Sequence, residues 1–130
     1  MHINEMLEMV AEFQNATDQT VNLEPSLLKT KEAILRFELM KEENEEYFEA
    51  CQNKDLVETL DAVVDKMYIL LGTINSHGLQ NVFTESFNRV HINNLSKIDS
   101  ETGKVLRNEM GKIIKPKGFK PVDLSDLINN

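Results

Sequence analysis

Apolar residues recur at helical spacing along the first three quarters of the chain. This period predicts four helices, at residues 3–16, 27–51, 55–76 and 81–95. After residue 97, glycines, prolines and lysines interrupt short apolar pieces, which is typical of an irregular tail with a short hairpin and a last helical turn. We therefore expect one all-α domain over residues 1–130. It would be a bundle of four to five helices, with a helical core at about 1–96 and a basic tail at 97–130.

The second and third predicted helices are separated only by the short turn at residues 52–54. Asp55 follows this turn, and Glu58 comes three residues later, which is the spacing of a capping box with Asp in place of the usual Ser or Thr. The pattern predicts two long antiparallel helices joined as a hairpin.

Some of the glutamates in the stretch EENEE, residues 42–46, interrupt an apolar helix face. At about 100° per residue, Glu43 and Glu46 fall beside the side that carries Leu35 and Leu39. Other glutamates of this helix form a stripe that suits solvent: Glu38, Glu45 and Glu49. Glu43 and Glu46 are therefore predicted to point toward a packed surface.

The third predicted helix repeats this arrangement. Its acidic residues Glu58, Asp61 and Asp65 form a stripe next to the apolar one that contains Leu60. The two acidic stripes are thus predicted to lie between packed surfaces.

Folding the hairpin about residue 52 places Glu46 opposite Glu58, and Glu43 opposite Asp61. Four carboxylates so close together cannot all stay ionised unaided, so either some are protonated or a hard cation binds there. Oxygen ligands of this kind suit Mg²⁺ or Mn²⁺. Redox iron is disfavoured because no Glu-x-x-His pair is present.

The charge distribution adds an anion-binding region to this picture. The chain has a formal net charge of −8, which argues against nucleic acid or an anionic membrane as partner. Residues 97–120 nevertheless hold seven basic and three acidic residues. A lone cysteine, Cys51, excludes an internal disulfide, and no apolar run approaches the roughly 18 residues of a membrane span, so a cytoplasmic location is expected.

The acidic residues also match a known signature, EExxE followed after a spacer by ExxD. Here it consists of Glu42, Glu43, Glu46, Glu58 and Asp61. This constellation resembles the all-α nucleoside triphosphate pyrophosphohydrolase superfamily, which contains MazG-like enzymes, phosphoribosyl-ATP pyrophosphohydrolases and dimeric dUTPases.

Two segments of the tail extend the resemblance. FNRVHINNLSK at 87–97 and GKIIKPKGFKPVDL at 111–124 are similar to the C-terminal half of small phage and bacterial members. Three positions depart from that pattern: Asn93 for Ser, Phe119 for Tyr and Val122 for Pro.

The resemblance implies an enzyme that splits a nucleoside triphosphate between its α and β phosphates, giving a monophosphate and pyrophosphate. It also implies that Mg²⁺ is bound by four carboxylates: Glu43, Glu46, Glu58 and Asp61. Such a metal neutralises phosphate charge and lowers the pKa of bound water, and a nearby carboxylate orients or deprotonates that water. Glu42 is the candidate for this last role, with a plain solvent-facing residue as the alternative. Asp65 is expected to hold a further metal or to bind the substrate sugar.

The basic tail is expected to contact the polyphosphate or sugar through Asn94, Lys97, Lys112 and Lys115. For any single lysine, a role in solubility is an equal alternative. A second apolar patch on the second helix, made by Ile34, Phe37 and Phe48, predicts a homodimer or a tetramer built from dimers.

Three functions remain open from the sequence. The first is Mg²⁺-dependent hydrolysis of (deoxy)nucleoside triphosphates, such as dUTP or dCTP, in nucleotide-pool housekeeping. The second is hydrolysis of phosphoribosyl-ATP, which the long tail disfavours. The third is a non-enzymatic helical interaction module whose acidic pairs form interhelical salt bridges.

Overall fold

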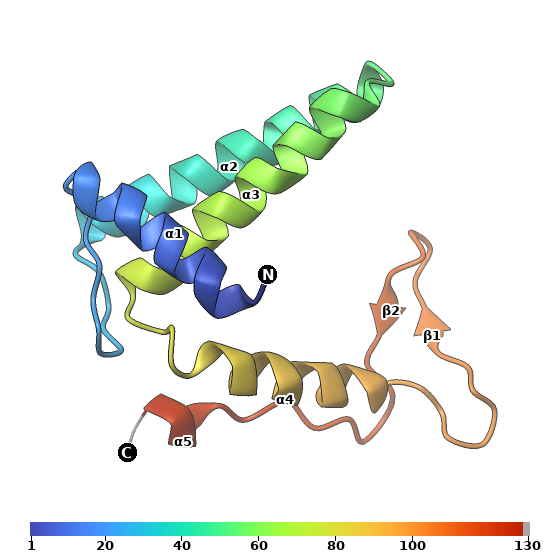
Figure 1. The fold of residues 1–130 in the computed structure, drawn as a ribbon. Coiled ribbons are helices and arrows are strands. Elements are labelled where there is room, and N and C mark those ends of the chain that lie inside the picture. Colours follow the sequence, from blue (N-terminus) through green and yellow to red (C-terminus); the bar gives the residue numbers. More distant parts are fainter. Residues whose placement is uncertain (129–130) are drawn as a thin grey trace. The chain divides into compact units, whose positions relative to one another are not determined.

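The computed structural model describes residues 1–128, and helices dominate its regular structure (Figure 1). The elements are α1 (Ile3–Ala16), α2 (Thr30–Gln52), α3 (Leu56–Ser76), α4 (Phe83–Leu95), β1 (Leu106–Arg107), β2 (Ile113–Ile114) and α5 (Ser125–Ile128). The predicted all-α class is confirmed. Within residues 1–128, no helix combines the length and the apolar character that a membrane crossing needs.

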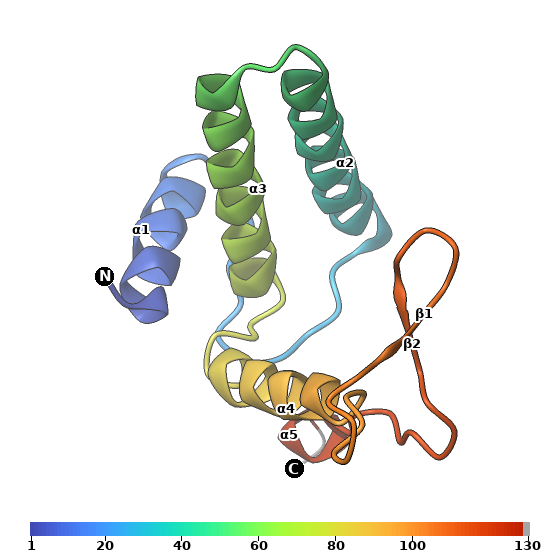
Figure 2. The same cartoon turned by 90° about the vertical axis from the view of Figure 1, so that its right-hand side faces the viewer.

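The chain divides into two compact units, residues 1–81 and the residues from Val82 onward. In the first unit, α2 and α3 run antiparallel side by side and α1 packs against α3 (Figures 1 and 2). The buried apolar side chains of α1 and the second half of α3 are Leu7, Val10, Leu71 and Ile74. Buried amides fix the same contact: Gln14 donates to the Gly72 carbonyl and Asn75 to the Leu7 carbonyl, both at 2.9 Å.

Local chemistry explains where the two long helices begin. The Asp55 carboxylate accepts a hydrogen bond from the Glu58 backbone N–H at 3.1 Å, which caps α3 as predicted. Helix α2 starts at Thr30, three residues later than predicted from Leu27. The preceding segment bonds to the end of α3 instead, since the Ser26 N–H donates to the His77 carbonyl at 2.9 Å.

The close contact between the segment before α2 and the turn after α3 requires a glycine at position 78. Gly78 has a φ of +66°, and a Cβ there would lie 2.1 Å from the Glu24 carbonyl oxygen. Both the left-handed backbone and the close approach therefore exclude other residues.

In the second unit, the chain leaves α4, forms the β1–β2 hairpin and returns to α4. The hairpin is antiparallel, with Leu106 opposite Ile114. On the return, the Arg89 guanidinium of α4 donates to both carboxylate oxygens of Asp126 in α5, at 2.6 and 3.0 Å. The predicted short hairpin and last helical turn are thus both present.

Apolar side chains in the first half of α3 are exposed to solvent in the single chain. Leu56, Leu60 and Val64 are 81%, 63% and 54% exposed, and Phe48 of α2 is 61% exposed. The apolar stripe predicted along all of α3 is therefore buried only from Leu71 onward.

Candidate active site

Three carboxylates meet where α2 faces α3. Glu43 and Glu46 of α2 and Asp65 of α3 each offer an oxygen that lies within 4.8 Å of the other two. Glu43 and Asp65 are half-buried, whereas Glu46 is exposed. The Oε2 atom of Glu43 is buried without a hydrogen-bond partner. A buried acceptor that lacks a donor suits a cation, so the donor set fits a hard divalent ion.

The proximity of these carboxylates changes their acidity. Burial raises the pKa of Glu43 to about 7, with the adjacent Glu46 carboxyl as the next cause. The charges of Asp65 and Glu42 act on Glu43 in the same direction. Burial also raises the pKa of Asp65, assisted by the charges of Asp61 and Glu46. The cluster therefore favours protons or a cation over three free negative charges.

The pairing across the hairpin differs from the predicted one. The predicted partner of Glu43 was Asp61, but the residue that shares the cluster with it is Asp65. Because α2 ends at Gln52 and α3 begins at Leu56, the turn is centred near residue 54 rather than 52. This shift moves the residue opposite Glu43 along α3 by about one helical turn.

Glu58 and Asp61 lie beside the cluster rather than in it. They border a hollow of about 410 Å³, which is lined by Glu46, Glu49, Ala50, Asn53, Glu58, Asp61 and Ala62. Glu46 belongs to both the cluster and the hollow. The four predicted metal ligands thus form a continuous acidic surface with Glu46 as its common member, while exposed Glu42 adjoins Glu43.

Small side chains allow this arrangement near the turn. Ala50 and Ala62 are 6% and 3% exposed, and both lie at the hollow. Residues without long side chains let the two helix backbones approach each other, which leaves room for acidic groups alongside. This role could not be predicted from the sequence, since alanine is common in any helix.

In the second unit, two of the predicted substrate-binding lysines lie against the same aromatic ring. The ammonium nitrogens of Lys97 and Lys115 lie 5.6 and 6.0 Å from the centre of the Phe119 ring. Of the other two predicted substrate-binding residues, Lys112 is exposed just before β2 and Asn94 is exposed on α4. Two like charges over one ring form a natural place for an anion.

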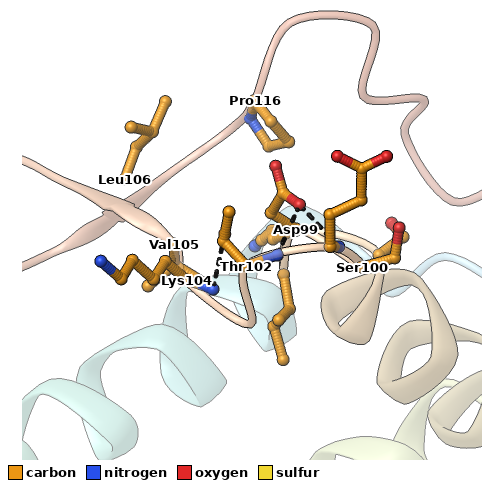
Figure 3. Close-up of a pocket in the computed structure, with 11 residues that line it drawn as sticks. Asp99, Ser100, Thr102, Lys104, Val105, Leu106 and Pro116 are labelled. Atoms are coloured by element: carbon orange, nitrogen blue, oxygen red, sulfur yellow. Dashed lines mark hydrogen bonds between the residues drawn. The ribbon is translucent and has the colours of Figure 1, made fainter.

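A hollow of about 530 Å³ adjoins Lys97 (Figure 3). Its wall is a tight loop in which the Asp99 carboxylate accepts from the backbone N–H groups of Glu101 and Thr102, at 2.8 and 3.1 Å. These bonds lower the pKa of Asp99, so the carboxylate stays ionised within an otherwise basic segment. Lys104 closes the same loop, since its backbone N–H donates to the Thr102 hydroxyl at 3.2 Å, and Pro116 also lines the hollow (Figure 3).

Comparison with known protein families agrees with the acidic helix pair. A family model described as phosphoribosyl-ATP pyrophosphohydrolase matches residues 10–94, about two thirds of the chain. The comparison with curated proteins found no match. The family description corresponds to the second of the enzyme functions considered from the sequence, rather than to the first.

The matched range contains the whole of α2 and α3, and therefore every carboxylate of the cluster and the hollow. The chain belongs to the phosphoribosyl-ATP pyrophosphohydrolase family, within the MazG-like superfamily, and is a hydrolase of phosphoric anhydride bonds in nucleotide-like substrates.

Proposed function

We propose that this enzyme hydrolyses a nucleotide triphosphate between the α and β phosphates in a Mg²⁺-dependent reaction, with phosphoribosyl-ATP as the first candidate substrate. The family match supports this substrate. The observation that carries the metal dependence is the carboxylate cluster, in which the buried Glu43 Oε2 atom lacks a donor.

Mg²⁺, when bound, would neutralise phosphate charge and lower the pKa of a water molecule. Glu43, Glu46 and Asp65 would hold the ion on the cluster side, and Glu58 and Asp61 would hold it or a second ion at the hollow. Mn²⁺ suits the same oxygen ligands. Glu42 is exposed beside Glu43, and we assign it the role of orienting the attacking water or accepting its proton.

A second candidate substrate class is supported by the tail. Residues 95–130 lie outside the matched range, and they contain the converging Lys97 and Lys115. It includes the stretch 111–124, one of the two segments that resemble the small phage and bacterial enzymes, so (deoxy)nucleoside triphosphates such as dUTP and dCTP are the alternative. In either case Lys97 and Lys115 bind phosphate, assisted by Lys112 and Asn94, in the same chain or in a second copy.

We further propose that two copies associate through the bare apolar faces of α2 and α3. Ile34, Phe37 and Phe48 are 55%, 58% and 61% exposed, and Leu60 is 63% exposed. Full burial of a completely exposed side chain of this kind stabilises by roughly 1.5–3 kcal/mol, and covering the exposed part of each of these would contribute about half of that, which favours a homodimer or a tetramer built from dimers. Light scattering on a Phe37→Ser/Phe48→Ser double variant tests this: it should shift the mass toward the monomer, and an unchanged mass would contradict the interface.

A substrate panel tests the reaction. Phosphoribosyl-ATP, dUTP, dCTP and the common nucleoside triphosphates are incubated with the enzyme and Mg²⁺, and products are separated by anion exchange. We expect pyrophosphate and a monophosphate from at least one substrate, with no product in EDTA. Release of inorganic phosphate alone, or no product from any substrate, would contradict the proposal.

A further inference from the structure

A buried cation without a carboxylate partner lies between α2 and α3. Arg36 is 6% exposed, and within residues 1–128 no carboxylate is within ion-pair distance of it. Its guanidinium instead donates to three neutral oxygens, belonging to Ile69, Thr73 and Gln19 at 2.7, 3.1 and 3.0 Å. Burial lowers the pKa of Arg36, because it opposes the charged form.

The helix opposite is shaped to admit this guanidinium. A Cβ at Gly72 would lie 2.6 Å from Arg36 Nη2 and 3.2 Å from the Gln14 amide nitrogen. Any side chain at position 72 would therefore displace the guanidinium or force α3 away from α2. Arg36 and Gly72 together define how closely the two helices approach at this level.

This clamp lies on the same inner side of the helix pair as the carboxylate cluster. Seven residues, about two helical turns, separate Arg36 from Glu43, so both point in nearly the same direction from α2. On α3, the Ile69 carbonyl that accepts from Arg36 lies one turn beyond Asp65. Buried Ala50 and Ala62 bring the helices together on the other side of the cluster. The carboxylates are thus bracketed by two close helix contacts.

We propose that Arg36 is a positioning residue that holds α2 and α3 at the separation the cation site requires. Three carboxylates repel one another and push the two helices apart when no ion is bound. A guanidinium fork, bonded to α3 and to the α1–α2 connection, opposes that movement at a fixed distance. The inference rests on the proposed metal dependence and deepens it.

Removing Arg36 distinguishes a positioning role from a simple electrostatic effect, because the two predict opposite changes in the affinity for a divalent ion. Loss of a positive charge near an anionic site should tighten divalent binding by Coulomb attraction alone. Loss of the clamp should weaken binding, because the oxygens no longer share one coordination sphere. A buried charge can often be replaced by an apolar residue without loss of stability, so an apolar variant is expected to fold.

The experiment measures Mn²⁺ affinity by electron paramagnetic resonance and folding by circular dichroism, for the wild-type chain and five variants. Arg36→Met is expected to retain its helical signal and to bind Mn²⁺ about tenfold more weakly, the lower end of the effect of groups that orient metal ligands. Lys41→Met is the matched control, because it removes the same charge from the exposed side of α2. It should leave Mn²⁺ affinity unchanged or tighten it.

Three further variants keep the test decisive if Arg36→Met fails to fold. Arg36→Lys keeps the charge but loses the planar fork, so it should also weaken Mn²⁺ binding. Gly72→Ala should lower thermal stability in wild type. In Gly72→Ala/Arg36→Met the 2.6 Å contact with Arg36 is absent and only the 3.2 Å approach to the Gln14 amide remains, so most of the lost stability should return without recovery of Mn²⁺ affinity.

The outcomes distinguish a failure of the metal dependence from a failure of the positioning role. Wild type that binds no Mn²⁺ would overturn the metal dependence itself. Wild type that binds Mn²⁺, together with folded Arg36→Met and Arg36→Lys variants that bind it equally or more tightly, would overturn the positioning role alone.

Discussion

Two regions of the molecule carry opposite charges in different structural settings. One is the acidic seam between α2 and α3, which consists of Glu43, Glu46, Glu58, Asp61 and Asp65. The other is the basic tail of the second unit. In the seam, the helix pair brings one carboxylate oxygen each of Glu43, Glu46 and Asp65 within 4.8 Å of one another. In the tail, Lys97 and Lys115 converge only over the Phe119 ring, on a segment that is mostly exposed.

This difference determines how each region responds to substitution. The seam stores like-charge repulsion within the fold, so its side chains act as one group and the loss of one should disable the rest. The lysines of the tail are held independently, so their contributions to phosphate binding should be graded. The predictions below test this contrast.

The largest effect is expected from Glu46→Gln, because Glu46 is shared by the cluster and the hollow. Turnover should fall by more than about 100-fold, beyond the loss typical of residues that only support metal ligands. In EDTA the melting temperature should rise or stay unchanged, because one repelling charge is gone. Steady-state kinetics and calorimetry give the two readouts.

Glu38→Gln is the matched control for this substitution. It makes the same chemical change at an exposed position of α2, and it should retain wild-type kinetics. If Glu46→Gln kept more than a tenth of wild-type turnover, the seam would not act as one unit.

A smaller and graded effect is expected from the tail. Lys97→Ala and Lys115→Ala should each raise KM about tenfold, since a hydrogen bond to a charged group contributes about 1.5–3 kcal/mol. Mn²⁺ affinity should be unchanged, which separates the tail from the seam. Lys117→Ala removes the same charge from an exposed position and is the control. A loss of metal binding in either variant would show that the two regions are coupled.

The raised pKa of Glu43 predicts how metal-free stability depends on pH. Its pKa moves from 4.5 to about 7 on folding, so the folded state binds a proton more tightly than the unfolded chain. Its contribution to stability is therefore complete below pH 4.5 and is lost as the pH rises through 7. Urea unfolding in EDTA should give a lower stability at pH 7.5 than at pH 5.

Glu43→Gln should flatten this part of the pH profile. Mg²⁺ competes with the proton, so its stabilising effect on wild type should grow over the same interval. A wild-type profile that is level between pH 5 and 7.5 would mean that the Glu43 carboxyl is not strained.

Many residues of the acidic seam could be predicted from the sequence, because helical periodicity determines which residues share a helix face. Glu43 and Glu46 were assigned to an inward face on that basis, and the structure places both in the cluster. Only Glu43 of the two is partly buried, however: Glu46 is exposed, as are Glu58 and Asp61 of the predicted acidic stripes. The pairing with α3 was wrong by one turn, since the centre of a hairpin depends on how many residues the cap and turn consume. Periodicity carries no information on that number.

Arg36 was not recognised from the sequence for a different reason. An arginine on a long charged helix reads as a solvent-facing residue, and the pattern does not reveal that Gly72 leaves space for it. The only sequence signal was a glycine inside a strongly helical segment, where it costs about 1 kcal/mol relative to alanine and so has a packing reason.

The smallest effect is expected where the tail is fastened to α4. Hydrogen bonds from Arg89 to Asp126 lower the pKa of that carboxyl, but Asp126 is exposed and Arg89 is only half-buried, so solvent screens the pair. Arg89→Ala should increase hydrogen exchange in residues 123–128 and leave α2 and α3 as protected as before. Added salt should reproduce part of this change in wild type, because it screens the same pair. Arg107→Ala removes one charge from the β1–β2 hairpin and should not affect exchange in α5. If Arg89→Ala lowered Mn²⁺ affinity, the tail would not be independent of the acidic cluster, and the contrast between the two regions would be wrong.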